Sequence, residues 1–329
     1  MKTILVLGSN SPSGAYFCAH AAEAGYRIIA TSRSPEKQTV YLPYKWKKYR
    51  NNVHFFQLDL NYDLEVFRDL VAQYNPSYVV NFASQSMVGQ SWEDPLHWMQ
   101  TNVVSLVSLL EELRKMTCLE KYIHFSTPEV YGSTEGWVKE SRNYAPSTPY
   151  ASSRAAGDMN VVLWQETYDI PAIITRAANI YGEGQQLFRI IPRTFLSAYT
   201  QETLPLHGGG FSERAFIHCE DVAEALLLLC ERGKIGEDYH LSPKESITIR
   251  NLVQSICDVA KCRFEDVVVE SGDRLGKDQA YLLDPAKIFN QLDWKPSIPL
   301  DEGLLRCSHW VQENIEALKN HPREYLHQK

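Results

Sequence analysis

The stretch Lys2-Thr-Ile-Leu-Val-Leu-Gly8-Ser-Asn-Ser11-Pro-Ser-Gly14 decides the fold that we expect for this chain. It has the pattern of a short apolar strand, a turn between two glycines and the start of a helix. Gly8 permits a tight turn, Gly14 lets helix and strand pack closely, and a helix N-terminus presents amide groups to phosphate oxygens. The turn predicts a dinucleotide site with contacts from Gly8, Asn10, Ser11 and Gly14.

The rest of the N-terminal half alternates short apolar runs with amphipathic stretches. Strands are expected at residues 4–7, 27–31, 53–58, 78–83, 122–125 and 172–175, and helices at residues 14–24, 64–74, 95–116 and 149–167. Strands that are apolar almost throughout fit a parallel sheet covered by helices on both faces. The expected class is α/β, a doubly wound parallel Rossmann sheet.

After about residue 182 this alternation gives way to mixed segments, with helices expected at residues 190–199, 222–230, 249–259 and 300–315. No flexible linker separates the two parts, which favours packed lobes with a ligand cleft between them. We expect a dinucleotide-binding domain at residues 1–182 plus 215–241. Residues 183–214 plus 242–329 would form a smaller mixed α/β lobe that binds the substrate.

The composition narrows the class of partner. The chain has 329 residues, of which 44% are hydrophobic and 22% charged, with a formal net charge of -7. An acidic protein repels a nucleic-acid backbone, so no nucleic-acid partner is expected. No apolar run approaches the roughly 20 residues that span a bilayer, and the first is too short for a signal peptide, so we expect a cytoplasmic protein without a membrane partner. The cysteine and histidine spacings predict no metal site.

The end of the second expected strand bears on the choice between NAD and NADP. An NAD-selective site places an acidic residue there, whereas this chain has Ser32 and Arg33. A hydroxyl and a guanidinium suit a 2′-phosphate, which favours NADP, although a solvated loop arginine is the alternative. Asp59 and Leu60, after the third strand, are placed to meet the adenine. The basic and aromatic connection at residues 33–50 is expected to be a surface or subunit-contact loop near the adenosine.

Three polar segments follow later strands: Asn81-Phe-Ala-Ser-Gln-Ser86, Ser126-Thr-Pro-Glu-Val-Tyr-Gly132 and Tyr150-Ala-Ser-Ser-Arg154. They lie at or just beyond the carboxyl ends of strands, where open α/β sheets bind ligands. Together they resemble the extended short-chain dehydrogenases/reductases that process nucleotide sugars, especially the dTDP-glucose and GDP-mannose 4,6-dehydratases. The resemblance runs from about residue 2 to residue 310 and includes Asn102.

The resemblance implies the catalytic residues. Tyr150 corresponds to the family's acid/base, Thr127 to the residue that hydrogen-bonds the reacting sugar hydroxyl, and Glu129 to the base of the dehydratases. Arg154 stands where the family has lysine; its charge, one helical turn away, favours the phenolate and thus lowers the phenol pKa, but it cannot release a proton near neutral pH. Pro128 replaces the aspartate that is the acid for water loss in the dTDP-glucose enzymes, so that acid is unassigned.

The resemblance also implies the ligand contacts and the assembly. Ala83, Tyr150 and Arg154 would contact the cofactor, and the substrate, a nucleotide-diphosphate sugar, would contact Ser84, Gln85, Asn179, Arg189, Arg214 and Arg274. His207 lies near the expected nucleobase region, and we expect this histidine to have a structural role. A homodimer or dimer of dimers would form through the helices at residues 95–116 and 149–167, which carry apolar stripes such as Leu106, Leu109, Leu110 and Leu113.

The implied activity is that of an NAD(P)-dependent nucleotide-sugar 4,6-dehydratase. Such an enzyme oxidises carbon 4, eliminates water across carbons 5 and 6, and returns the hydride to carbon 6. The UDP-glucuronate decarboxylases also lack the aspartate at the Pro128 position, so a decarboxylase, a 4-epimerase or a 4-dehydrogenase of the same family stays open. A catalytically inactive NAD(P)-sensing Rossmann protein is the further alternative, because Ser11, Pro128 and Arg154 all depart from the family pattern.

Overall fold

The computed structural model describes residues 1–46, 48–272 and 280–327, and its centre is a seven-stranded parallel sheet. The strands are β1 (Thr3–Leu7), β2 (Arg27–Ser32), β3 (Val53–Gln57), β4 (Tyr78–Asn81), β5 (Lys121–Phe125), β7 (Ala172–Ala177) and β12 (Asp238–Leu241). Their order is β12-β7-β5-β4-β1-β2-β3, so the winding reverses beside β1. Doubly wound sheets bind dinucleotides at this point of reversal. The predicted sheet is confirmed.

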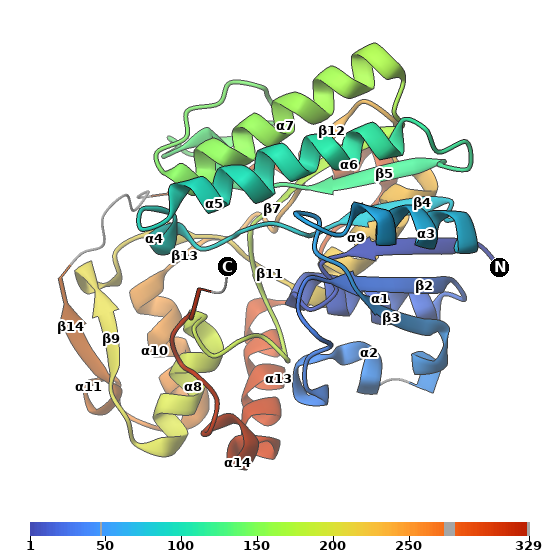
Figure 1. Ribbon diagram of the computed structural model, residues 1–329. Coiled ribbons are helices and arrows are strands. Elements are labelled where there is room, and N and C mark those ends of the chain that lie inside the picture. The colour runs from blue at the N-terminus through green and yellow to red at the C-terminus, as the bar shows by residue number, and fades with distance from the viewer. Residues whose placement is uncertain (47, 273–279, 328–329) are drawn as a thin grey trace.

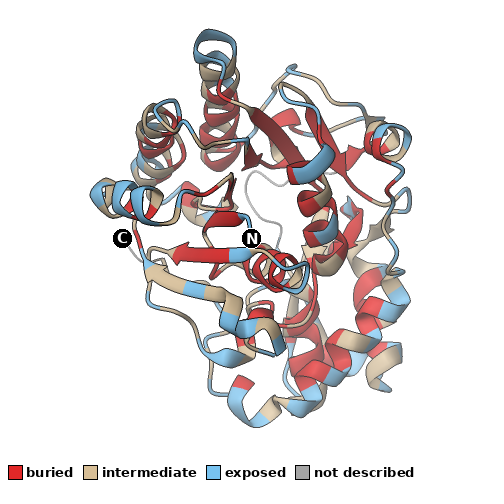
Figure 2. Ribbon diagram, turned by 90° about the vertical axis from the view of Figure 1, so that its right-hand side faces the viewer, coloured by how far each residue is buried: buried red, intermediate tan, exposed pale blue. Residues whose placement is uncertain are grey.

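Helices cover both faces of the sheet (Figure 1). On one face α1 (Pro12–Glu23) packs against α9 (Cys219–Arg232), and on the other lie α3 (Leu64–Tyr74), α6 (Ser105–Leu113) and α7 (Pro149–Tyr168). Because successive side chains of a strand point to opposite faces, Ile4 and Val6 belong to the first core and Leu5 and Leu7 to the second. Figure 2 shows that the central strands are buried.

The expected helix at residues 95–116 is helical without a break from residue 95 to residue 113, but its middle is not α-helical. It consists of α5 (Pro95–Met99), a π-helical stretch (Gln100–Val104) and α6. The π-helical stretch carries the buried Asn102, whose Nδ2 donates to the Gln85 carbonyl oxygen (3.0 Å) and to Ser153 Oγ (2.9 Å). Both contacts join Asn102 to residues far from it in the sequence, so no local sequence pattern predicts them. Such stretches are frequent at functional sites.

A second group of helices packs around its own apolar core at the lower left of Figure 1. It contains α8 (Ile190–Thr200), α10 (Ile249–Ala260), α11 (Phe264–Val267), α13 (Leu300–Glu313) and α14 (Ile315–Leu318), beside the pair β9 (Leu204–His207) and β14 (Val268–Ser271). The shorter elements are η1 (Thr39–Tyr41), α2 (Pro43–Trp46), η2 (Lys48–Asn52), α4 (Val88–Ser91), η4 (Pro128–Tyr131), β6 (Trp137–Val138), β8 (Asn179–Tyr181), η5 (Gly208–Gly210), β10 (Glu213–Arg214), β11 (Phe216–His218), β13 (Ile247–Thr248), β15 (Leu282–Leu283) and α12 (Ala286–Leu292).

The connection at residues 33–50 lies mostly at the surface, as expected, but residues 41–44 are buried, and a subunit contact there stays a prediction. Tyr41 and Tyr44 are buried, and Tyr41 packs against Trp310 of α13 with ring centroids 6.4 Å apart. The connection therefore joins the sheet to the second group of helices. Of the helices in the described ranges, none is long and apolar enough to cross a membrane.

Candidate active site

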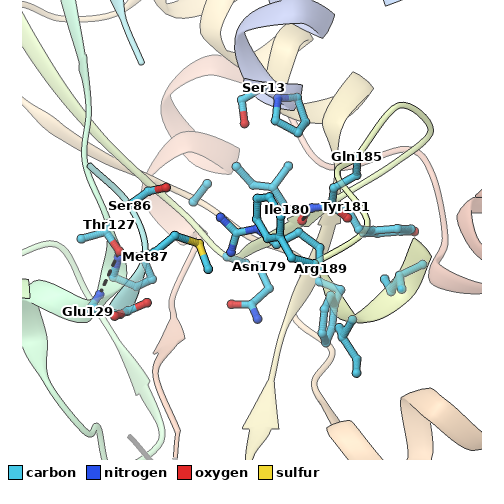
Figure 3. A pocket seen from close by; sticks show the side chains of 18 of the residues that line it. Ser13, Ser86, Met87, Thr127, Glu129, Asn179, Ile180, Tyr181, Gln185 and Arg189 are labelled. Atoms are coloured by element: carbon cyan, nitrogen blue, oxygen red, sulfur yellow. Dashed lines mark hydrogen bonds between the residues drawn. The ribbon is translucent and has the colours of Figure 1, made fainter. Parts of the chain in front are cut away.

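A cavity of about 520 Å³ opens at the carboxyl edge of the sheet and extends to the second group of helices. Among its lining residues are Ser11, Ser84, Thr127, Glu129, Tyr150, Arg154, Asn179, Arg189 and His207, all singled out in the sequence. In Figure 3, Thr127 and Glu129 lie beside Ser86 and Met87, with Asn179 and Arg189 across from them. The tertiary fold thus brings the four expected catalytic side chains to one cavity, while their roles stay predictions.

The turn after β5 sets the position of Glu129. Thr127 caps η4, since its Oγ1 accepts from the Glu129 backbone N–H at 3.4 Å. Pro128 occupies the first helical position, where a missing N–H costs little. Gly132 ends the turn at a φ of +67°, and a side chain there would collide with the Ala145 carbonyl oxygen. The local sequence therefore forces one tight turn whose second residue, Glu129, faces the cavity.

The start of α7 sets the position of Tyr150. Thr148 caps this helix by accepting from the Ala151 N–H at 3.1 Å, so Tyr150 lies in the first turn and is 7% exposed. One turn later, Arg154 donates from Nη2 to the Phe125 carbonyl oxygen of β5. This hydrogen bond thus fixes the guanidinium between the end of β5 and α7.

The environment of Tyr150 pulls its pKa in both directions. Burial raises the pKa of the phenol above its usual value, and the charge of Glu129 adds to this rise. The charges of Arg154 and Arg189 and a hydrogen bond with Thr127 oppose it. Arg154 therefore lowers the pKa of Tyr150, as expected, although the effect of burial is larger and the pKa stays above its usual value.

A buried ion network holds α7 behind the cavity. Asp158 follows Arg154 by one helical turn and accepts from Arg176 Nη2 at 2.6 Å, while Arg176 Nη1 donates to Asp238 at 2.7 Å. Burial alone would raise the pKa of Asp158, but the Arg176 charge and the nearby His124, whose Nε2 is 3.5 Å from Asp158 Oδ1, bring it to about 2. The network links α7 to β7 and β12, and so fixes the helix that carries Tyr150.

The turn between β1 and α1 has the shape that a diphosphate needs. Gly8 has a φ of +86°, and a Cβ there would lie 2.8 Å from the Ala83 backbone nitrogen. A Cβ on Gly14 would lie 2.5 Å from the Gly8 carbonyl oxygen. Ser11 caps α1, since its Oγ donates to the Gly8 carbonyl oxygen (2.7 Å) and accepts from the Gly14 N–H (3.1 Å). The residues present therefore fit a dinucleotide, with the helix N-terminus facing its phosphates.

The expected adenosine contacts surround the ends of β2 and β3. Asn10 Nδ2 donates to Ser34 Oγ at 3.0 Å and so ties the turn to the segment after β2. Lys37, which the sequence had not singled out, donates from Nζ to the Asn10 carbonyl oxygen at 3.1 Å, and burial lowers its pKa to about 8. These predicted cofactor contacts lie outside the cavity lining: Gly8, Asn10, Gly14, Ser32, Arg33, Asp59, Leu60 and Ala83.

The expected substrate contacts divide into two groups. Asn179 and Arg189 line the cavity, and Arg214 lies 4.2 Å over the ring of Tyr281. Tyr281, which no motif in the sequence marks, also lines the cavity and donates to Asn179 Oδ1 at 3.0 Å.

Two further substrate contacts expected from the sequence lie outside the cavity lining or outside the described residues. Gln85 does not line the cavity, because its side chain lies beside His97, with 3.4 Å between the two Nε2 atoms. His207 Nδ1 is 2.9 Å from Ser271 Oγ. Arg274 lies outside the described residues. One group of possible metal ligands, Asp94, His97 and His327, has its ligand atoms within 4.8 Å of one another. No sequence spacing could reveal this group, since His327 comes from the far end of the chain.

Comparison with known proteins gives consistent results. The sequence model of the GDP-mannose 4,6 dehydratase family matches residues 5–307. A dTDP-glucose 4,6-dehydratase from Neisseria gonorrhoeae is 33% identical over 287 residues, which is 81% of this chain and 83% of the relative. The dTDP-glucose 4,6-dehydratase of Bacillus anthracis in complex with NAD superposes with a TM-score of 0.86 at 27% identity, over 97% of this chain and 99% of that one. The Streptomyces venezuelae enzyme with NAD and TYD bound gives 0.88 at 28% identity, over 96% and 98%.

Proposed function

The chain belongs to the GDP-mannose 4,6 dehydratase family, and on this premise we propose that it is a nucleotide-sugar 4,6-dehydratase that uses a nicotinamide dinucleotide. The observation that supports it best is the convergence of Thr127, Glu129 and Tyr150 on one cavity at the edge that carries the dinucleotide turn. An alcohol oxidation followed by a water elimination needs this combination of an acid/base, a second base and a hydride acceptor.

In the proposed reaction Tyr150 takes the proton of the sugar 4-hydroxyl, which the Thr127 hydroxyl holds in place. A dinucleotide held at the turn from Gly8 to Gly14 would supply the redox chemistry, namely uptake of the hydride of carbon 4 and its later return to carbon 6. Arg154 and Arg189 stabilise the phenolate form of Tyr150 against the cost of its burial. Glu129 then removes the hydrogen of carbon 5, which the neighbouring ketone acidifies. The 6-hydroxyl leaves as water with one of the two protons that Tyr150 and Glu129 have taken up, and the other proton returns to carbon 5 when carbon 6 regains the hydride. The product is a 4-keto-6-deoxy sugar, and no cofactor is consumed.

Mass spectrometry of the products from a panel of UDP-, dTDP-, GDP- and CDP-sugars tests this function. A product lighter by one water molecule is expected. Loss of carbon dioxide would instead establish the decarboxylase, an unchanged mass with a new sugar would establish the epimerase, and loss of two hydrogens would establish the dehydrogenase. No turnover with any sugar would favour the inactive dinucleotide-sensing protein.

We also propose that the two parts of the chain bind different ligands. Residues 1–182 plus 215–241 would bind the dinucleotide, and residues 183–214 plus 242–329 would bind the nucleotide diphosphate of the sugar. Arg189, which lines the cavity, and Arg214, which lies over the ring of the lining residue Tyr281, support the second role, because guanidinium groups suit diphosphate oxygens. The expected cytoplasmic location stays a prediction.

We propose that the cofactor is NADP rather than NAD, although the solved relatives named above hold NAD. Arg33 and Lys37 are both cations just after β2, the position of the 2′-hydroxyl or 2′-phosphate. Replacing Arg33 with Ala should weaken NADPH binding about tenfold or more, through loss of a charge-assisted hydrogen bond, and change NADH binding far less. Fluorescence titration of both dinucleotides measures this. A wild-type protein that holds NAD and shows no preference for NADP would refute it.

The proposed assembly is a homodimer or a dimer of dimers through α5, α6 and α7, which lie side by side in Figure 1. The leucines at 106, 109, 110 and 113 do not serve this contact, because they are buried in the chain's own core. Exposed apolar residues on α5, the π-helical stretch and α7 include Leu96 (78%), Val104 (52%), Met159 (60%) and Leu163 (54%).

Light scattering should therefore give the mass of two or four chains at micromolar concentration. The substitution Leu163→Glu places a charge on this surface and should shift the mass toward one chain. Leu305→Glu is the control, since Leu305 is also exposed (49%) but lies on α13. If the wild-type protein has the mass of one chain, the proposed dimer is wrong.

A further inference from the structure

The C-terminal tail, residues 319–327, runs from α14 past α8 and ends close to α5 (Figure 1). Its first half is anchored to the second group of helices. Glu324 lies 3.4 Å from Arg193 of α8, and Arg323 pairs with Glu202. The Tyr325 ring packs edge-on against Phe188, with 5.4 Å between centroids. The tail therefore starts on one side of the cavity that contains the expected active site.

The last described residue of the tail reaches the other side. The His327 ring stacks on Trp98 of α5, with centroids 4.7 Å apart and planes at 29°. Its Nε2 lies 2.8 Å from His97 Nδ1, and His97 Nε2 lies 3.4 Å from the Gln85 amide nitrogen. Since Gln85 follows β4, these contacts join the end of the tail to the segment after that strand.

Tyr325 makes the corresponding contact after β2. Burial raises the pKa of its phenol, and the charge of Arg33 together with a hydrogen bond from it opposes that rise. The same phenol oxygen is 3.3 Å from His327 Nδ1. Arg33 Nη1 is buried and has no hydrogen-bond partner among the described residues. A donor of Arg33 is thus left for an oxygen of a ligand beside Tyr325.

The sheet order shows where these contacts put the tail. β1 lies between β2 and β4. The tail has Arg33, after β2, on one side and His97, beside Gln85 after β4, on the other, which places its end near the carboxyl end of β1. The turn from Gly8 to Gly14 lies at this end of β1, so the tail lies near the place where a dinucleotide would put its adenosine half.

We propose that the tail is part of the cofactor site: Tyr325 and His327 cover the adenosine ribose of the bound dinucleotide, and the contact of His327 with His97 holds the tail closed over it. The tail then slows cofactor release. This deepens the proposed function, because a cycle that returns its hydride needs no exchange of dinucleotide between turnovers. The contacts bridge both parts of the chain, so the closed tail also resists their separation.

Dissociation of the reduced dinucleotide tests the inference without any sugar. The wild-type protein is loaded with NADH or NADPH, whichever it binds more tightly, and mixed in a stopped-flow instrument with an excess of the oxidised form. Deletion of residues 322–329 should raise the dissociation rate about tenfold or more, as expected from loss of two or more hydrogen bonds. Tyr325→Phe and His327→Ala should each give part of this rise. Leu326→Ala is the matched control, because Leu326 lies between the two residues and is 67% exposed.

Two outcomes would overturn the inference. An unchanged dissociation rate after the deletion would show that the tail does not touch the cofactor. Tighter binding with faster association would show that the tail competes with the dinucleotide. Neither result depends on whether the bound sugar loses water, so the inference and the proposed function fail separately.

Discussion

The substitution Glu129→Gln should trap the enzyme after the first hydride transfer, with reduced nicotinamide accumulating on the protein. Glutamine keeps the shape of the side chain and its place in the turn capped by Thr127, but it removes the basic carboxylate. Tyr150 and the dinucleotide turn are untouched, so carbon 4 is still oxidised while carbon 5 keeps its hydrogen. Formation of the 4-keto-6-deoxy product should fall about 10²-fold or more.

Absorbance of the reduced nicotinamide in a single-turnover experiment measures the accumulation, and mass spectrometry measures the product. Glu135→Gln is a suitable control, since Glu135 is an exposed carboxylate on the same connection. Product formation at the wild-type rate by the Glu129→Gln protein would disprove its role as the elimination base.

The substitution Tyr150→Phe should block the reaction one step earlier. The ring stays in the first turn of α7, but no group remains to accept the proton of the 4-hydroxyl, so no reduced nicotinamide should form. Turnover should again fall about 10²-fold or more. Tyr168→Phe is the matched control, because Tyr168 lies on the same helix and is 48% exposed.

The two variants must therefore differ in absorbance although both lose activity. Only a reaction in which Tyr150 acts before Glu129 gives this difference. If both variants gave the same spectrum, a simple dehydrogenase or an epimerase would become the better assignment, because neither needs a second base after the oxidation.

The sequence by itself determined the sheet, the dinucleotide turn and the order of the catalytic motifs. The sheet can be predicted because buried parallel strands are apolar along their length. The turn can be predicted because it needs glycine at positions 8 and 14, where a Cβ would collide with backbone atoms. Thr127, Glu129 and Tyr150 were expected from the resemblance of their segments to the nucleotide-sugar dehydratases, and in the structure these segments begin at caps formed by Thr127 and Thr148.

Only the tertiary structure decided the features that depend on residues far apart in the chain. The π-helical stretch follows from contacts of Asn102 with Gln85 and Ser153, and the burial of Tyr41 follows from its contact with Trp310. The net pKa of Tyr150 depends on burial, which no local spacing reports.

The same holds for Tyr281 and for the C-terminal tail. Tyr281 lines the cavity and contacts Asn179 and Arg214, which lie far from it in the sequence, and His327 contacts His97 across 230 positions of sequence. Propensity and periodicity act over a few residues, whereas these contacts form only when the whole chain has packed. For that reason the sequence determined the fold and the motif that we expect to carry out the chemistry, and the tertiary structure decided what surrounds that motif.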